Sequence, residues 1–167
     1  ESKPKRINSN SGNRIGNCEL ITYRLAQATT GSYSLFHGAS NSSQSGLVLA
    51  AVTTVINRVN EVYESEVGIR LILIANTDLV FYYGTGGGGY PNNGSSADLD
   101  QNQTNCTNVI GSANYDIGHV FGTGDGGIAG LGVVCDNSRK AEGYTGRPNP
   151  VGDPFTIDYV THEMGHQ

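Results

Sequence analysis

The sequence predicts an α/β fold in which a twisted mixed β-sheet carries one upstream helix and a second helix at the end of the chain. Residues 18–28 and 69–75 have the patterns of strands, and the segment between them has helical periodicity. Residues 115–121 and 128–135 indicate two further short strands, and residues 153–167 indicate the final helix. The length of 167 residues is that of one domain.

The first 75 residues contain the clearest secondary-structure signals. Residues 1–16 are rich in Asn, Ser and Gly, which indicates a polar N-terminal leader, so we expect the domain to cover residues 17–167. Gly68 is the expected end of the first helix, and the second strand follows at once. This strand–helix–strand order predicts two parallel strands joined by a right-handed crossover. Apolar residues at three- and four-residue steps form the expected buried stripe of the helix: Leu47, Ala51, Val55, Val59, Val62 and Tyr63.

The second half of the chain is richer in glycine and harder to interpret. Residues 84–108 form a long polar stretch, which we expect to be a loop, and loops of this length are usually functional or disordered. Residues 136–152 are also expected to be loop. Asp153 suits the N-cap of the final helix, and Pro154 suits its first helical position.

The composition excludes several classes of protein. Charged residues make up 15% of the chain, against about 25% in an average soluble domain. The net charge of -5 and a pI near 5.2 argue against a nucleic-acid partner. No stretch approaches the roughly 18 apolar residues of a membrane span. With 24 glycines, the chain is predicted to be a loop-rich protein of the kind that is secreted.

The final helix carries the one motif with an evident chemistry, H-E-x-x-H, at residues 162–166. Four residues on a helix turn through about 400°, so His162 and His166 share one face and both imidazoles can reach one Zn²⁺. Glu163 is placed to take a proton from a zinc-activated water as general base. The alternative is a helix without a metal site, in which the two histidines and the glutamate are simply solvated.

Two imidazoles do not complete a catalytic zinc site, which normally has three protein ligands. His37 and His119 are the only other histidines. Neither has the spacing of a motif, so we expect both to be structural or surface residues.

The motif and its surroundings resemble the metzincin zinc metallopeptidases, in particular the bacterial reprolysin-like (adamalysin-like) type. Residues 162–166 are similar to the start of the signature H-E-x-x-H-x-x-G-x-x-H. Residues 115–121, 126–135 and 152–155 are also similar to this family, as are Lys140, Ala141, Gly143, Thr145 and Gly146. The resemblance covers most of residues 18–167, and its second half is the more specific part.

This resemblance implies a secreted zinc endopeptidase, often made with a pro-segment, that has a zincin-like N-terminal subdomain. His162 and His166 match zinc ligands, and Glu163 matches the general base. The family's third His would fall at about position 172, after a Gly at about position 169. We therefore expect that the chain ends within the signature and lacks the family's C-terminal subdomain and Met-turn.

The resemblance also matches residues 127–133 to the edge strand that lines the active-site cleft. An unpaired edge offers N–H and C=O groups to an extended peptide, and small residues let its backbone come close. The alternative is that these glycines serve only a turn and tight packing. The candidate substrate-binding residues are Gly127, Ile128, Ala129, Gly130, Leu131 and Gly132.

A second cation site is a weaker prediction. Asp98, Asp100 and Asn102 alternate like the start of a calcium loop, but Gln103 and Val109 stand where an EF-hand has Gly and Glu. An EF-hand is therefore excluded, and a looser Ca²⁺ site competes with a solvated polar loop.

The three cysteines leave at least one thiol without a partner in the chain. Cys106 can pair with Cys135, and Cys135 can equally pair with a cysteine beyond residue 167. Cys18 lies at the start of the first predicted strand.

Together these observations predict a secreted zinc-dependent endopeptidase that acts on a protein or peptide substrate. We expect a monomer, associated at most with its own C-terminal part or pro-segment. The alternative is a non-catalytic peptide-binding or zinc-binding remnant of the same fold. A third possibility is another zincin clan, whose third zinc ligand is a Glu further downstream.

Overall fold

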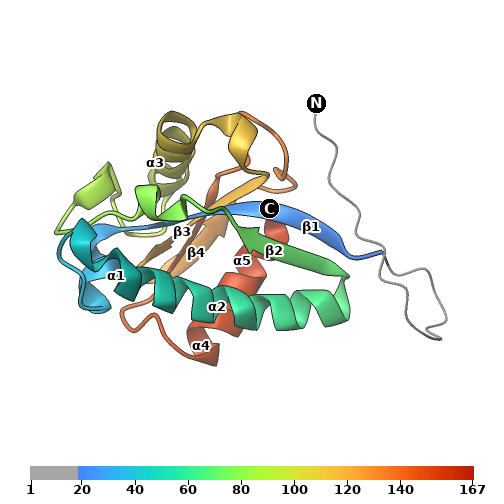
Figure 1. The fold of residues 1–167 in the computed structure, drawn as a ribbon, viewed down its shortest axis with the longest axis horizontal. Coiled ribbons are helices and arrows are strands. Elements are labelled where there is room, and N and C mark those ends of the chain that lie inside the picture. Colours follow the sequence, from blue (N-terminus) through green and yellow to red (C-terminus); the bar gives the residue numbers. More distant parts are fainter. Residues whose placement is uncertain (1–18) are drawn as a thin grey trace.

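The structure is a computed structural model that describes residues 19–167. The predicted leader at residues 1–16, together with Cys18, lies outside the described residues. One sheet forms the centre of the molecule, with its strands in the order β2-β1-β3-β5-β4 (Figure 1). The strands are β1 (Ile21–Thr29), β2 (Ile69–Leu73), β3 (Ile117–Gly122), β4 (Gly126–Ala129) and β5 (Gly143–Gly146).

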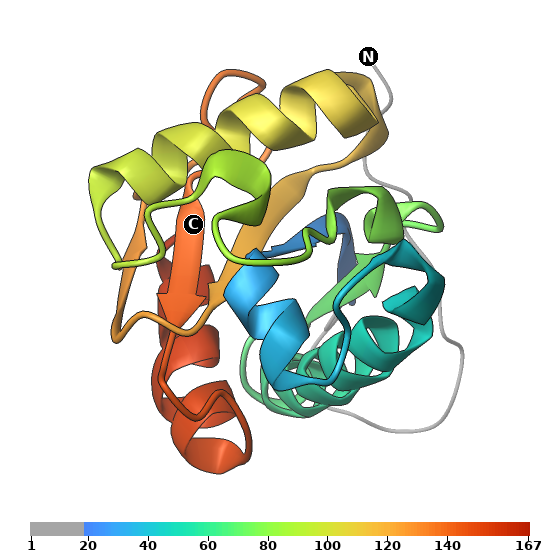
Figure 2. The ribbon, with the colours of Figure 1, turned by 90° about the vertical axis from the view of Figure 1, so that its left-hand side faces the viewer.

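Helices cover both faces of the sheet and bury two hydrophobic clusters (Figure 2). The helices are α1 (Gly31–Phe36), α2 (Ser45–Glu66), α3 (Ser96–Asn105), α4 (Asp153–Phe155) and α5 (His162–His166). On one face, α2 and the final helical segment share a cluster that contains Val52, Phe121 and Met164. On the other face, α3 contributes Leu99 to a cluster around Val120.

The strand–helix–strand unit of the first half is confirmed. β1 is parallel to β2, with Ile21 opposite Ile69, and it is parallel to β3 on its other side, with Leu25 opposite Ile117. β5 adds in parallel to β3, and β4 is antiparallel to β5. Because β3 is an inner strand covered on both faces, all its residues are buried and its sequence does not alternate. The predicted mixed α/β architecture is therefore correct.

The first predicted helix is present as α2, but its buried face differs slightly from the predicted stripe. Gly68 follows the helix with a φ of 68°, a left-handed conformation that suits glycine. Leu47 is 52% exposed, although it was expected to lie in the stripe. Val55 and Val59 of the predicted stripe are buried as expected, whereas Val48 and Val52 take the places predicted for Leu47 and Ala51. The buried β-branched residues are Val48, Val52, Val55, Ile56 and Val59. The short helix α1 lies between β1 and α2 and was not predicted separately.

The predicted loop at residues 84–108 is wrong, because it contains α3. Few apolar residues mark this helix, and its one large apolar side chain, Leu99, is buried. Its start is set instead by a capping box, in which Ser95 and Asp98 each bond to the other's backbone N–H. The helix is thus stabilised by local polar bonds rather than by a broad apolar face.

The strands near the predicted cleft are also shifted. β4 begins at Gly126 and ends at Ala129, whereas the sequence predicted a strand over residues 128–135. The chain leaves the strand through a turn in which Gly132 has a φ of 62° and Cys135 a φ of 64°. β5 lies within the predicted loop at residues 136–152, and its four buried residues are too few to show periodicity.

The outer edge of β2 is covered by a side chain of α2. Asn60 Nδ2 donates a hydrogen bond to the carbonyl oxygen of Leu71 at 2.8 Å, and the Leu71 N–H donates to Asn60 Oδ1 at 2.7 Å. Asn60 is 7% exposed and Leu71 is 3% exposed, so water cannot easily replace either bond. This single amide therefore pairs both backbone groups of an edge-strand residue and fixes α2 against the sheet.

We predict that Asn60→Ala lowers the free energy of unfolding by about 2–3 kcal/mol, since two buried backbone groups lose their partners. Urea unfolding followed by circular dichroism measures this change. Asn57→Ala is the matched control, because Asn57 lies in the same helix and is exposed. Equal losses in the two variants would contradict the anchoring role of Asn60.

Candidate active site

The H-E-x-x-H segment lies at the end of one continuous helical stretch. α4 is followed by a π-helical segment, Thr156–Thr161, and then by α5. The predicted final helix is therefore confirmed, but its cap lies one residue earlier than expected. Gly152 is the N-cap, with a φ of 73°, and Asp153 and Pro154 are the first residues of the helix.

This helical stretch is attached to the core on the face away from solvent. Val160 is fully buried and Met164 is 4% exposed, while Ile157 is partly buried. The Tyr63 hydroxyl of α2 donates to the carbonyl oxygen of Thr161 at 2.7 Å. This bond fixes the turn of the helix that precedes His162.

The two histidines of the motif point toward the same position. The Nε2 atoms of His162 and His166 are 3.0 Å apart, and their ring planes are 87° apart. Two nitrogen ligands of one tetrahedral zinc ion at 2.0–2.1 Å are about 3.3 Å apart. Both side chains are exposed, so the pair is accessible from solvent and has nearly the spacing that a shared zinc ion needs.

Glu163 lies against the backbone of the edge strand β4. A Cβ atom built on Gly127 falls 2.4 Å from Glu163 Oε1 and 2.5 Å from its Cγ, so only glycine fits at this position. Glu163 is 9% exposed. The structure therefore brings the glutamate of the motif into direct contact with the first predicted substrate-binding residue.

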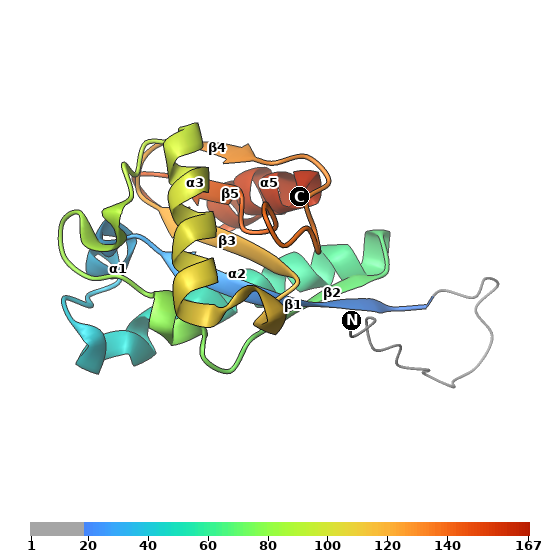
Figure 3. The same ribbon diagram turned by 90° about the horizontal axis from the view of Figure 1, so that it is seen from above.

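The predicted substrate-binding residues divide between a strand and a turn. Gly127, Ile128 and Ala129 belong to β4, which forms the edge of the sheet beside α5 (Figure 3). Gly130, Leu131 and Gly132 lie beyond the strand, in contrast to the predicted edge strand over residues 127–133.

The turn after β4 is bonded to the end of the motif helix. The Gly132 N–H donates to the carbonyl oxygen of His166 at 2.8 Å, and the Val134 N–H donates to that of Gln167 at 3.0 Å. These bonds satisfy carbonyl groups that the end of a helix leaves free. The turn therefore holds the helix end, while β4 supplies the free edge.

A buried polar network beneath the motif was not recognised in the sequence. His119 Nδ1 lies 2.6 Å from Gln167 Oε1, and its Nε2 lies 2.9 Å from Thr145 Oγ1. Gln167 Nε2 donates to the carbonyl oxygen of Gly118 at 2.9 Å, so the Gln167 oxygen accepts and His119 Nδ1 carries the proton. The only signal for Gln167 was its position directly after His166, and nothing in the sequence marked Thr145.

His119 and His37 are both occupied away from the motif pair. His119 is fully buried, and burial lowers its pKa to about 4 even though the bond to Gln167 raises it. His37 packs its ring on Tyr33 and Phe36 at the end of α1. Within residues 19–167, no three side chains among His, Cys, Asp and Glu are grouped to hold a metal ion.

The residues of the looser calcium prediction do not converge. Asp98 is buried and accepts hydrogen bonds from the backbone N–H groups of Asn92 and Asn93. Asn102 is also buried and bonds to the Tyr90 hydroxyl and to a backbone carbonyl group. The structure therefore gives no support for Ca²⁺ at this position, because two of the three predicted ligands have structural partners.

The two described cysteines are free thiols. Cys106 is buried and Cys135 is exposed, and burial raises the pKa of the Cys106 thiol to about 12. The suggested Cys106–Cys135 disulfide does not form in this structure, and Cys18 lies outside the described residues.

A mixed sheet with an edge strand beside a helix that carries H-E-x-x-H defines the zincin-like metallopeptidase class. The family model described as Metallo-peptidase family M12B Reprolysin-like matches residues 49–167, and the chain belongs to this family. The resemblance to reprolysin-like metzincins is thus confirmed. A comparison with curated proteins gives no significant match. Among residues 19–167, no helix combines the length and the apolar character that a membrane span needs.

We predict that His119 makes stability depend on pH. Its pKa of about 4 in the folded chain lies below the value of about 6.5 for an unfolded His, so the unfolded state binds a proton first. The stabilisation is complete above pH 6.5 and is lost as the pH falls toward 4. The difference between the two pKa values corresponds to about 3 kcal/mol.

Urea unfolding between pH 7 and pH 4 tests this prediction. The difference in stability between the wild-type chain and His119→Gln should shrink by about 3 kcal/mol as the pH falls. His37→Gln is the control. Its free energy of unfolding should still fall between pH 7 and pH 4, because His119 is intact in this variant. A difference that stays constant with pH contradicts the assignment of a neutral, buried His119.

Proposed function

We propose that this chain is the catalytic part of a secreted zinc endopeptidase, in which His162 and His166 bind zinc and Glu163 is the general base. The family match supports metallopeptidase activity in general. The observation that carries the finer assignment is the convergence of the two Nε2 atoms at 3.0 Å beside a free sheet edge. The low charge of the chain supports secretion.

The donor set fits zinc, since imidazole nitrogens are common zinc ligands and the measured spacing is close to that in a shared tetrahedral shell. When bound, zinc supplies Lewis acidity, which polarises a carbonyl group and lowers the pKa of water. A third ligand, as catalytic zinc normally has, is not grouped with this pair among residues 19–167.

Glu163 is suited to proton transfer by its position. Its carboxylate lies against Gly127, on the α5 face of the strand with which we propose that a peptide pairs. It follows His162 directly in the chain, which is the position of the general base in the H-E-x-x-H motif. We assign it the role of taking a proton from the attacking water and passing it to the leaving amine.

The sheet edge accounts for the binding of a peptide in the middle of a chain. β4 is the last strand of the sheet, and an extended peptide can join it through main-chain hydrogen bonds. Such bonds need no free terminus and no particular side chain. This form of binding supports an endopeptidase rather than an enzyme that recognises chain ends.

We predict that, in the complete enzyme, Glu163→Ala folds and keeps its zinc but lowers kcat/KM for peptide cleavage by about 10²- to 10⁴-fold, the usual effect of losing a general base. Cleavage of an unfolded protein substrate and metal analysis of the same samples measure both properties. Glu66→Ala, at the exposed end of α2, is the control. Undiminished cleavage by Glu163→Ala would falsify the assigned role.

We also predict that His162→Asn and His166→Asn each lose zinc, because one remaining imidazole is a weak ligand set. Equilibrium dialysis followed by elemental analysis measures the bound metal, and His37→Asn serves as the control that keeps it. Retained zinc in both motif variants contradicts the ligand assignment. Zinc binding without any peptide cleavage by the wild-type protein would favour the alternative of a non-catalytic zinc-binding remnant.

A further inference from the structure

The hydrogen-bond register of β4 shows which of its backbone groups face outward. Gly130 N–H donates to the carbonyl oxygen of Glu142 at 2.8 Å, and the pairing places Ile128 opposite Tyr144. In an antiparallel pair, residues whose backbone groups bond to the partner alternate with residues whose groups point away. Gly127 and Ala129 therefore turn their N–H and C=O groups toward the free edge.

The same alternation sorts the side chains of β4 between the two faces of the sheet. Gly127 faces Glu163 and α5, whereas Ile128 packs against the cluster on the α3 side. A peptide strand that pairs with Gly127 and Ala129 has one residue directly opposite Ile128. Side chains of directly opposite residues lie on the same face of a sheet, so this residue points toward α3 and away from the zinc motif.

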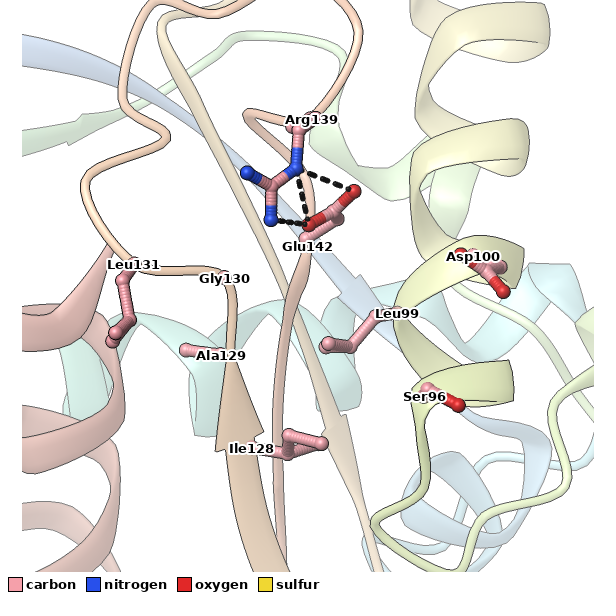
Figure 4. Close-up of a pocket in the computed structure, with 9 residues that line it drawn as sticks. All are labelled: Ser96, Leu99, Asp100, Ile128, Ala129, Gly130, Leu131, Arg139 and Glu142. Carbon is pink, nitrogen blue, oxygen red and sulfur yellow. Dashed lines mark hydrogen bonds and ion pairs between the residues drawn. The ribbon is translucent and has the colours of Figure 1, made fainter.

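A pocket of about 450 Å³ lies on that side of the edge, between β4 and α3 (Figure 4). Its apolar part is formed by Leu99 of α3 and Ile128 of β4, and the Ile128 side chain points toward α3. We call this cavity the α3 pocket. It is lined by Ser96, Leu99, Asp100, Ile128, Ala129, Gly130, Leu131, Arg139 and Glu142.

The charges of the α3 pocket do not cancel. Arg139 is neutralised by Glu142, since its Nη2 lies 2.8 Å from Glu142 Oε2 and its Nε donates to both carboxylate oxygens. Asp100 is exposed on α3 and has no ion-pair partner among residues 19–167. One negative charge therefore remains beside an apolar surface, and the pocket contains no other cation than Arg139.

We propose that the α3 pocket is a specificity subsite for a Lys or Arg side chain of the substrate, at the position directly opposite Ile128. This inference rests on the proposed peptide binding to β4. The aliphatic part of a basic side chain packs on Leu99 and Ile128, and its charged end reaches Asp100. Glu142 is held by Arg139, so Asp100 is the group that selects the charge.

Peptide binding tests this subsite without relying on catalysis. The test uses the isotope-labelled chain and blocked peptides Ala-Ala-X-Ala-Ala, in which X is Lys, Leu or Glu and the alanines can slide along the edge. Amide NMR signals of Ile128 and Ala129 report binding at β4, and those of Leu99 and Asp100 report filling of the α3 pocket. The Lys peptide should bind about two- to fivefold more tightly than the Leu peptide, as expected for one partly exposed charge pair.

Asp100→Asn should abolish this preference for Lys while leaving the affinity for the Leu peptide unchanged. Asp78→Asn is the matched control, because Asp78 is exposed, lies outside the pocket and gives the same change in net charge. Circular dichroism confirms that both variants fold.

The possible outcomes distinguish failure of the α3 pocket as a subsite from failure of the proposed peptide binding to β4. Binding at β4 with equal affinity for all three peptides overturns the subsite and leaves peptide binding at the edge in place. A Lys preference that persists in Asp100→Asn also overturns it. Peptides that leave the Ile128 and Ala129 signals unmoved overturn both the subsite and the proposed binding to β4.

Discussion

The contact between Gly127 and Glu163 is the constraint on which the candidate site depends. No residue with a Cβ atom fits at position 127, because that atom would lie within 2.6 Å of three Glu163 side-chain atoms. A larger residue would either turn the carboxylate aside or push α5 away from β4. The single missing side chain therefore lets the helix that carries the histidines approach the edge of the sheet, which is where an extended peptide can pair.

The short helix α5 is held in this position by bonds at its end. It forms the last five residues of the helical stretch that begins at Asp153, and a helix end leaves carbonyl groups free. The turn after β4 donates to the carbonyl groups of His166 and Gln167, and the Gln167 side chain bonds to His119 and Gly118 in β3. The direction of His166 thus follows from contacts with the sheet. The buried, neutral His119 helps to fix Gln167, which directly follows the exposed His166.

Sequence periodicity predicted the elements that bury a long apolar face, and it failed where local polar bonds decide the structure. α2 was recognised because its apolar residues recur at helical spacing, and the final helix was recognised from Asp153 and Pro154 at its start and from its H-E-x-x-H motif. α3 was missed because a capping box, with Ser95 and Asp98, starts a helix that has few apolar residues. β5 was missed because four buried residues have no measurable period. The approach of Glu163 to Gly127 depends on the pairing of β4 with β5, which no local pattern contains.

The two edges of the sheet differ in whether their outward backbone groups have hydrogen-bond partners, and this difference bears on the proposed function. At the β2 edge, Asn60 pairs with both backbone groups of Leu71 and blocks further pairing at this residue. At the β4 edge, the outward groups of Gly127 and Ala129 have no such cover within residues 19–167. An uncovered edge strand can pair with strands of other chains and so promote aggregation. The short length of β4 reduces this tendency. A side chain blocks pairing at the middle of one edge, and the other edge stays open beside the H-E-x-x-H helix, which supports the proposal that another strand binds at β4.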